Sequence, residues 1–296
     1  MTGQGNPLWL IAGCGQVGVR LANALAPRPV TGLVRSAESG ERLRRLGITP
    51  WVCDLDRPLA LPGKTADSRI WYLAPPPPRG RTDPRLAHFL QALEASGPPQ
   101  RLVYLGTTGV YGDCAGAWVD EHRPLAPVAD RARRRADAEA RLQRWCARWR
   151  VELIRLRVAG IYGPGKLPLE RLRARRPMIA RHRAPWTNRI HLDDLVQVLQ
   201  AAMARGRPGE VYNVSDGRPG NMADYFNAVA DAFGLPRPPV IDPDQAEAAL
   251  SPGLRSYLSE SRRIDNRKML RELGVTLRHP DLESGLAACR RAMVVS

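Results

Sequence analysis

The chain has 296 residues, of which 44% are hydrophobic, enough for one large α/β domain with a smaller lobe. No apolar run approaches the ~20 residues of a membrane span, and the first residues lack the pattern of a signal peptide, so we expect a cytoplasmic protein without membrane association. The net charge of +16 could attract nucleic acid, but aromatic residues make up only 6% of the chain and are not interleaved with the basic runs, which disfavours nucleic-acid binding.

The N-terminal half alternates short apolar strands with helical patterns. The strands are expected at residues 8–12, 29–35, 49–53, 70–74, 101–105 and 151–158, and the helices at 17–25, 38–46, 84–95 and 131–149. Such alternation predicts an α/β fold of the Rossmann type, with a doubly wound parallel sheet. The five cysteines are far apart and contain no C-x-x-C pair, so they predict neither disulfides nor a metal site.

The C-terminal half is less regular and rich in turns. It contains a strand pattern at residues 210–214 and helical patterns at 193–203, 222–233 and 266–273. We therefore expect residues 1–160 to form the nucleotide-binding domain, with residues 188–216 returning to it. Residues 161–187 and 217–296 would form a smaller substrate lobe that covers the sheet's carboxyl edge.

A glycine-rich turn follows the first strand and opens the first helix. Gly13-Cys14-Gly15-Gln16-Val17-Gly18 has the spacing G-x-G-x-x-G, the dinucleotide-binding fingerprint. In this motif Gly13 permits the tight turn, Gly15 lets a pyrophosphate approach the backbone, and Gly18 allows helix and strand to pack closely. A glycine-rich turn without a ligand is the alternative, but the strand before it and the helix after it favour a dinucleotide site.

The end of the second strand indicates which dinucleotide is bound. A carboxylate there would bind the ribose 2′-hydroxyl of NAD, whereas this chain has Arg35 followed by Ser36. Because a guanidinium can bind a 2′-phosphate, the pair favours NADP over NAD, although a solvated arginine is the alternative. The carboxyl ends of the other strands should share this crevice and bring Asp54, Ala74, Thr107 and Ala159 to it.

Six ordered segments together resemble the extended short-chain dehydrogenase/reductase superfamily, of the NAD-dependent epimerase/dehydratase type. They are residues 53–55, 72–75, 105–113, 157–165, 189–194 and 210–214, in addition to the glycine motif. The resemblance implies that Asp54 and Leu55 touch adenine, that Ala74 and Pro75 meet the cofactor, and that Thr107 holds the catalytic Ser/Thr position. It also implies that helices 84–95 and 131–149 could form a homodimer. Trp145 and Trp149 stand four residues apart and could line that contact, but core packing explains them equally well.

The long helix departs from the superfamily's Tyr-x-x-x-Lys pattern. With Glu139 setting the register, Arg135 stands where the lysine is expected and Arg131 where the catalytic tyrosine is expected. Arginine cannot serve as the general acid or base, although Arg135 could still donate to ribose hydroxyls. The alternative is a solvated helix face with i,i+4 pairs between Arg135 and Glu139 and between Asp137 and Arg141. This departure resembles the atypical, YeeZ-like branch of the superfamily.

Two functions remain open. One is an NADP-dependent oxidoreductase or epimerase acting on a small carbonyl or alcohol, with Thr107 orienting the substrate. The other is a catalytically weak protein that senses NADP(H) or serves as an interaction partner.

Other polar residues of these segments are weaker candidates for the proton donor. Tyr111, Asp113 and Tyr162 could face the crevice, but both tyrosines more often pack in the fold. His191 is expected to be a structural hydrogen-bonder, and Asp194 to fix the start of the following helix. Thr187 stands where nucleotide-sugar epimerases place a diphosphate-binding arginine, and Arg189 lies off that register.

Overall fold

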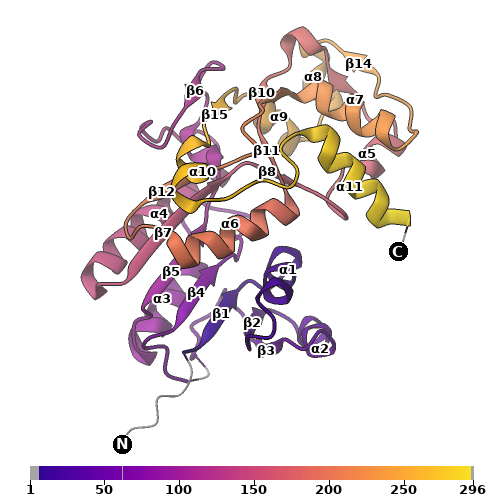
Figure 1. Cartoon of the computed structure of the whole chain (residues 1–296). Coiled ribbons are helices and arrows are strands. Elements are labelled where there is room, and N and C mark those ends of the chain that lie inside the picture. Colours follow the sequence, from indigo (N-terminus) through magenta and orange to yellow (C-terminus); the bar gives the residue numbers. More distant parts are fainter. Residues whose placement is uncertain (1–6, 62, 295–296) are drawn as a thin grey trace, which may run out of the picture.

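A seven-stranded parallel sheet forms the centre of the computed structural model, which describes residues 7–61 and 63–294 (Figure 1). The strand order is β12-β7-β5-β4-β1-β2-β3, and every neighbouring pair is parallel. The strands are β1 (Trp9–Ala12), β2 (Thr31–Val34), β3 (Thr49–Val52), β4 (Arg69–Tyr72), β5 (Arg101–Leu105), β7 (Glu152–Val158) and β12 (Val211–Val214). The predicted Rossmann-type fold is confirmed.

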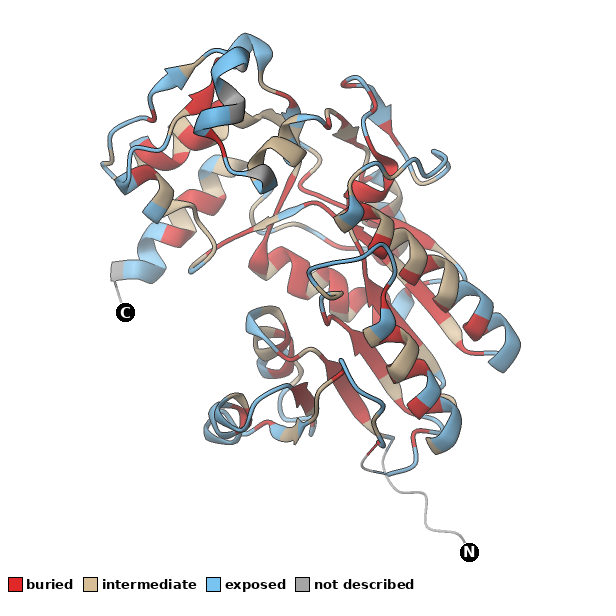
Figure 2. Ribbon diagram, turned by 180° about the vertical axis from the view of Figure 1, so that it is seen from behind, coloured by how far each residue is buried: buried red, intermediate tan, exposed pale blue. Residues whose placement is uncertain are grey.

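Helices cover both faces of the sheet, and Figure 2 shows the strands between them buried. One face packs on α1 (Gln16–Leu25), α2 (Ala37–Arg45), α6 (Leu192–Arg205) and α10 (Arg267–Leu273), and the other on α3 (Pro84–Ser96) and α4 (Asp130–Trp149). Side chains alternate between the faces, so Ile11 packs on the first face and Leu10 on the second. The two indoles Trp145 and Trp149 of α4 both donate to Glu94 of α3.

The strand order reverses between β1 and β4. Chains leaving these two strands turn to opposite sides of the sheet, which leaves a crevice at their carboxyl ends. The glycine turn after β1 and the 3₁₀ turn η1 (Thr108–Tyr111) after β5 both lie at this edge. The fold therefore places the predicted cofactor segments and Thr107 at the same edge of the sheet.

Short elements beyond the sheet build the lobe around a separate apolar cluster that includes Leu172, Phe226 and Leu286. They comprise the strands β9 (Met178–Ile179), β10 (Trp186–Thr187), β13 (Gly220–Asn221) and β14 (Val240–Ile241), the helices α5 (Leu169–Arg173), α7 (Met222–Ala232), α8 (Ala246–Ala249), α9 (Pro252–Leu258) and α11 (Leu282–Val294), and the 3₁₀ turns η2 (Arg181–Arg183) and η3 (Pro243–Gln245). The paired strands β8 (Gly160–Tyr162) and β11 (Arg189–His191) instead pack Ile161 and Ile190 on the core of the sheet.

The C-terminal part of the predicted lobe does not belong to it throughout. β15 (Arg263–Ile264) pairs with β6 (Trp118–Val119), and Met269, Leu273 and Val275 pack in the sheet's core. Residues 263–275 therefore pack with the main sheet, because the apolar side of α10 is buried against α6 and β12 rather than against the lobe. None of the helices in the described ranges combines the length and apolarity needed to cross a membrane.

Candidate functional site

The turn from β1 into α1 packs closely against the residues that follow β4. Gly13 has a φ of +86°, and a Cβ at this residue would lie 2.5 Å from the backbone of Ala74, so only glycine fits. The amides of Gly13 and Cys14 both donate to the carbonyl oxygen of Leu33, at 3.2 and 2.8 Å. These contacts fix the turn between β2 and β4.

The mouth of this turn is open at Gly15. A Cβ there would meet no heavy atom within 4 Å, whereas one at Gly18 would lie 3.0 Å from the side chain of Ile11. Gly15 is the N-cap of α1, which has no side-chain cap and no acidic residue in its first turn. The first amides of the helix therefore remain available to an anion, which the helix dipole also favours. This geometry fits the pyrophosphate of a dinucleotide.

The remaining motif residues shape the turn. Val17 packs against the core, and the Gln16 side-chain amide donates to the carbonyl of Pro164 at 2.7 Å, joining α1 to the turn after β8. Burial raises the pKa of the Cys14 thiol to about 12, so it stays protonated at neutral pH. Cys14 thus contributes to the shape of the site and carries no charge.

A cavity of about 540 Å³ and a second of about 350 Å³ lie at this edge of the sheet. The smaller one opens beside the glycine turn. Most of the predicted cofactor residues line it, namely Gly13, Cys14, Gly15, Arg35, Asp54, Leu55, Ala74 and Pro75.

Ser36 has a different role from the one predicted. Its hydroxyl accepts the amide of Ser39 at 3.2 Å and caps α2, and Ser36 does not line the cavity. Ser39 and Arg42 line the cavity instead. They stand three residues apart on one face of α2, a spacing that could have identified them from the sequence.

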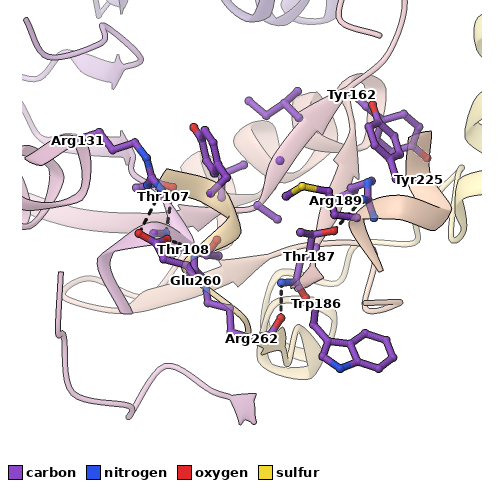
Figure 3. Close-up of a pocket in the computed structure, with 18 of the residues that line it drawn as sticks. Thr107, Thr108, Arg131, Tyr162, Trp186, Thr187, Arg189, Tyr225, Glu260 and Arg262 are labelled. Atoms are coloured by element: carbon purple, nitrogen blue, oxygen red, sulfur yellow. Dashed lines mark hydrogen bonds and ion pairs between the residues drawn. The ribbon is translucent and has the colours of Figure 1, made fainter. Parts of the chain in front are cut away.

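The larger cavity lies beyond β5, between the sheet and the lobe (Figure 3). Thr107 lines it at the end of β5, and its Oγ1 accepts the amide of Gly109 at 3.1 Å. Because the oxygen accepts that amide, the hydroxyl proton of Thr107 remains free to donate to a bound oxygen atom. This geometry is compatible with the substrate-orienting role predicted for Thr107.

Arg131, at the position of the expected tyrosine, connects α4 to the lobe. Its Nη2 donates to the carbonyl of Ser256 at 2.8 Å and pairs with Glu260 at 3.1 Å, and its guanidinium lies 4.0 Å above the ring of Tyr257. A Cβ on Gly109 would lie 3.4 Å from Arg131 Nη1 and 3.5 Å from Thr107 Oγ1. The guanidinium therefore stands beside Thr107 in the cavity.

Arg135 lies one turn further along α4, where it reaches the ends of two strands. Its Nη1 is 3.2 Å from the carbonyl oxygen of Leu105, 3.4 Å from the hydroxyl of Tyr104 and 3.5 Å from the carbonyl oxygen of Ala74. Ala74 lines the smaller cavity, and Leu105 and Arg135 line the larger one. Arg135 therefore stands between the two cavities: it lines the larger one and contacts Ala74, which lines the smaller one.

The predicted pair between Arg135 and Glu139 is wrong. Glu139 is 2% exposed and faces β7, where its carboxylate binds Arg157 at 2.8 Å. A buried carboxylate is held more strongly by a buried guanidinium than by one already engaged with carbonyl groups. The predicted pair between Asp137 and Arg141 is confirmed, at 2.8 Å.

A buried arginine in the larger cavity was not selected from the sequence. Arg189 is 8% exposed, donates to Thr187 Oγ1 at 2.7 Å and lies 4.0 Å above the ring of Tyr225. Burial lowers the pKa of Arg189. Arg189 therefore lines the cavity beside Thr187, although it lies off the expected register and the two residues belong to different strands, β11 and β10.

Tyr111 and Tyr162 pack in the fold, as expected. The hydroxyl of Tyr111 donates to Asn213 at 2.7 Å, and burial raises its pKa to about 12. Tyr162 lines the larger cavity but directs its hydroxyl to the carbonyl of Asp281 at 3.3 Å. Asp113 accepts the amides of Ala115 and Ser261 and is not part of either cavity lining.

His191 is the structural hydrogen-bonder that was expected. Its Nδ1 accepts the amide of Asp193 at 3.2 Å and caps α6, and burial lowers the pKa of the imidazole to about 4. The role predicted for Asp194 is wrong. Its carboxylate accepts the amides of Arg278 and His279, at 2.7 and 3.0 Å, and so holds the C-terminal segment rather than the start of the helix.

Comparisons with known proteins identify a family and solved structures that this chain resembles. The model of the NAD dependent epimerase/dehydratase family matches residues 85–215. A functionally unknown conserved protein from Silicibacter pomeroyi DSS is 36% identical, with a TM-score of 0.84 over 97% of this chain and 99% of that one. Residues 85–215 of the chain belong to the NAD dependent epimerase/dehydratase family.

Two dTDP-glucose dehydratases show how much of the chain these relatives share in sequence and in fold. Human dTDP-D-glucose 4,6-dehydratase is 24% identical over 136 residues, which cover 43% of this chain and 39% of the enzyme. The chain therefore matches well under half the length of this curated relative. The dTDP-glucose 4,6-dehydratase DesIV of Streptomyces venezuelae, solved as a double mutant with NAD and DAU bound, shares the fold at 20% identity, a TM-score of 0.78 and coverage of 96% and 95%.

Proposed function

We propose that this protein is an NADP-dependent oxidoreductase or epimerase that acts on a small carbonyl or alcohol substrate. The observation that carries the proposal is the position of Arg135 at the boundary between the two cavities, where it lines the larger one and contacts Ala74 of the smaller one. One cavity opens on the glycine turn and the other contains Thr107. A nicotinamide cofactor bound across this boundary would supply the hydride acceptor or donor, and the chain would supply binding and orientation.

The preference for NADP rests on the charge at the end of β2. Arg35 and Arg42 both line the smaller cavity, in the region where the adenine ribose would lie. The family is named for NAD, and DesIV was solved with NAD, so this preference needs its own test. We expect Arg35→Glu to weaken NADPH binding at least tenfold (about 1.4 kcal/mol) while NADH binding changes little.

The matched control is Arg45→Glu, because Arg45 is exposed on α2 outside the cavity lining. Fluorescence titration with both cofactors gives the four affinities. Equal losses for NADPH and NADH in Arg35→Glu would contradict the assignment of the 2′-phosphate to Arg35.

The larger cavity has a cationic lining. Lys166, Arg189 and Arg262 line it, and the carboxylate of Glu260 is already shared between Arg131 and Arg262. A substrate with a carboxylate or phosphate group would complement this charge. Thr107 would donate its hydroxyl proton to the reacting oxygen, and Arg135 would donate to ribose hydroxyls of the cofactor.

A catalytically weak NADP(H) sensor is the second candidate, and the contacts of Arg131 favour it. At this position Arg131 is held by Ser256, Glu260 and Tyr257, and an arginine side chain does not replace a tyrosine as general acid or base. The loss of the Tyr-x-x-x-Lys pair would then place the chain in the atypical, YeeZ-like branch. Such a protein would bind NADPH tightly without oxidising it.

Single-turnover experiments distinguish the two candidates. Bound NADPH is mixed with a panel of carbonyl compounds, and its absorbance is followed in the wild type, Thr107→Ala and Thr107→Ser. The enzyme predicts oxidation that is lost in Thr107→Ala and restored in Thr107→Ser. Tight binding without oxidation over the whole panel supports the sensor, and the variant Arg131→Tyr with Arg135→Lys should then gain activity if these positions are assigned correctly.

A further inference from the structure

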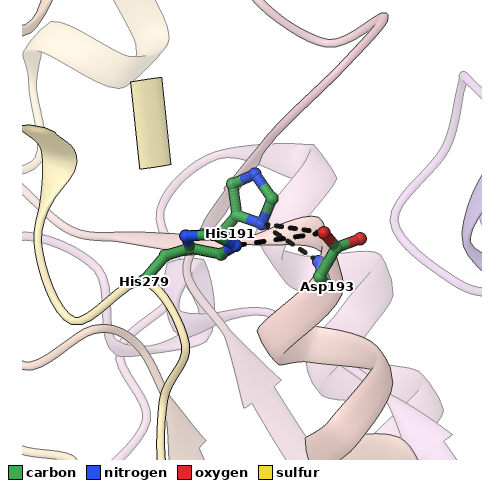
Figure 4. Close-up of side chains that lie close together, drawn as sticks. All are labelled: His191, Asp193 and His279. Atoms are coloured by element: carbon green, nitrogen blue, oxygen red, sulfur yellow. Dashed lines mark hydrogen bonds and ion pairs between the residues drawn. The ribbon is translucent and has the colours of Figure 1, made fainter. Parts of the chain in front are cut away.

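Two imidazoles and a carboxylate converge outside both cavities, where the C-terminal segment crosses the start of α6 (Figure 4). His191 ends β11, Asp193 lies in the first turn of α6, and His279 lies between α10 and α11. One ligand atom of each residue lies within 4.8 Å of the other two. We propose that this cluster binds a divalent transition-metal ion, for which Zn²⁺ is the best chemical match.

The spacing of the three groups suits a shared ion better than direct contacts. Asp193 Oδ2 is 3.7 Å from His191 Nδ1 and 3.9 Å from His279 Nε2. Both separations are too long for hydrogen bonds. Ligand atoms about 2.1 Å from one zinc ion stand roughly 3.4 Å apart in a tetrahedron, so closure around an ion requires only small side-chain movements.

The carboxylate and the second imidazole are already held in place by other groups. Arg20 binds Asp193 Oδ1 at 3.0 Å, which leaves Oδ2 directed at the imidazoles. Asp194 accepts the backbone amide of His279 at 3.0 Å and fixes the segment that carries the ring. The rings of His191 and His279 pack with their centroids 4.0 Å apart. Such outer partners orient the ligands of known metal sites.

The ligand atoms of the three side chains indicate which metal ions the site prefers. Two imidazole nitrogens and one carboxylate oxygen suit Zn²⁺ and its first-row neighbours, whereas Mg²⁺ and Ca²⁺ prefer oxygen ligands. Three protein ligands leave a fourth position for water. The positive charge of Arg20 beside Asp193 reduces the attraction for a cation, so moderate rather than very tight binding is expected.

One existing contact competes with the ion. His191 Nδ1 accepts the amide of Asp193 at 3.2 Å, and a metal ion on the same nitrogen takes that lone pair. Binding therefore exchanges a helix cap for a link between α6 and the C-terminal segment. The ion's role is structural, because the cluster shares no residue with either cavity lining.

The test uses untagged full-length protein stripped with a chelator and then titrated with Co²⁺, whose visible absorption reports nitrogen and oxygen coordination. We expect one Co²⁺ per chain, displacement by Zn²⁺ but not by Mg²⁺, and a higher melting temperature with Zn²⁺. His279→Phe keeps a ring against His191 and removes the ligand nitrogen, so it should lower metal affinity at least tenfold (about 1.4 kcal/mol).

The control is His122→Ala, because His122 stands 3.6 Å from Asp120 in an exposed pair and should not contribute. NADPH binding and circular dichroism show that each variant is folded. Loss of the Co²⁺ signal in folded His279→Phe, with the signal kept in His122→Ala, supports the site. Absence of stoichiometric binding in the wild type, or equal binding in His279→Phe, overturns it.

Discussion

Removing one partner of the buried ion pair between Glu139 and Arg157 should strongly lower the free energy of unfolding. The side chains are 3% and 6% exposed, and all three nitrogen–oxygen contacts lie between 2.8 and 3.2 Å. Glu139→Gln leaves the Arg157 guanidinium buried without a counter-charge, which costs about 3–5 kcal/mol in comparable sites. The hydroxyl of Tyr111 still accepts from Arg157 at 3.0 Å, so we expect a loss near the lower end of this range.

Urea denaturation at neutral pH, followed by tryptophan fluorescence, measures the change in the free energy of unfolding. Glu41→Gln is the matched control, because Glu41 pairs with Arg44 at 3.0 Å with side chains 50% and 60% exposed. Exposed pairs contribute about 0–1 kcal/mol. A loss in Glu139→Gln no larger than that in Glu41→Gln would refute the reasoning.

The double variant Glu139→Leu with Arg157→Met provides a second check. Replacing both charges by apolar groups removes the uncompensated guanidinium, so the double variant should be more stable than Glu139→Leu alone. If the double variant is the less stable of the two, the cost of the unpaired charge has been overestimated.

Two further predictions concern Asp216 and the glycine turn. Burial raises the pKa of Asp216 from 3.8 to about 7, so the stability that its carboxyl contributes is complete at low pH and is lost as the pH rises through 7. Asp216→Asn should therefore stabilise the protein by about 2 kcal/mol more at pH 8 than at pH 5, and equal effects in denaturation at the two pH values would contradict this. Gly13→Ala should lower the free energy of unfolding by about 2–4 kcal/mol, because its Cβ would lie 2.5 Å from Ala74 and its φ is +86°. Gly47→Ala, with a φ of +72° but open space, should lose only about 1–2 kcal/mol, and similar losses in the two variants would show that the close approach to Ala74 is unimportant.

The sheet could be predicted because its signals are local. The strands β1, β2 and β4 are short runs that are each followed by a helix, and β5 has the predicted bounds, Arg101–Leu105. The lobe contains strands of two residues, such as β9 and β14, which are too short to show any periodicity. The burial of α10 against the sheet depends on contacts with α6 and β12, which no local pattern reveals.

In the candidate site, too, local features could be predicted from the sequence, whereas contacts between distant segments could not. The spacing of Gly13, Gly15 and Gly18 predicted the turn because the turn itself is local, whereas the close approach of Gly13 to Ala74 depends on the pairing of β1 with β4. The pairing of Glu139 was predicted wrongly, because its partner Arg157 belongs to a neighbouring strand rather than to its own helix. Glu260 reaches Arg131 from 129 residues away, a contact that only the folded chain brings about.

Dinucleotide binding at the β1–α1 turn is tested most directly by Gly15→Asp. A side chain there enters open space, so the fold should be kept, but its carboxylate would occupy the position proposed for the pyrophosphate. Gly209→Asp, also with room for its side chain and outside both cavity linings, is the control; because the φ of Gly209 is +85°, circular dichroism and the melting temperature must show that this variant is folded. Titration of NADPH should show binding to the wild type and to Gly209→Asp, and binding about 100-fold weaker to Gly15→Asp. Equal NADPH affinity in all three proteins, or no affinity in the wild type, would contradict a cofactor site at this turn.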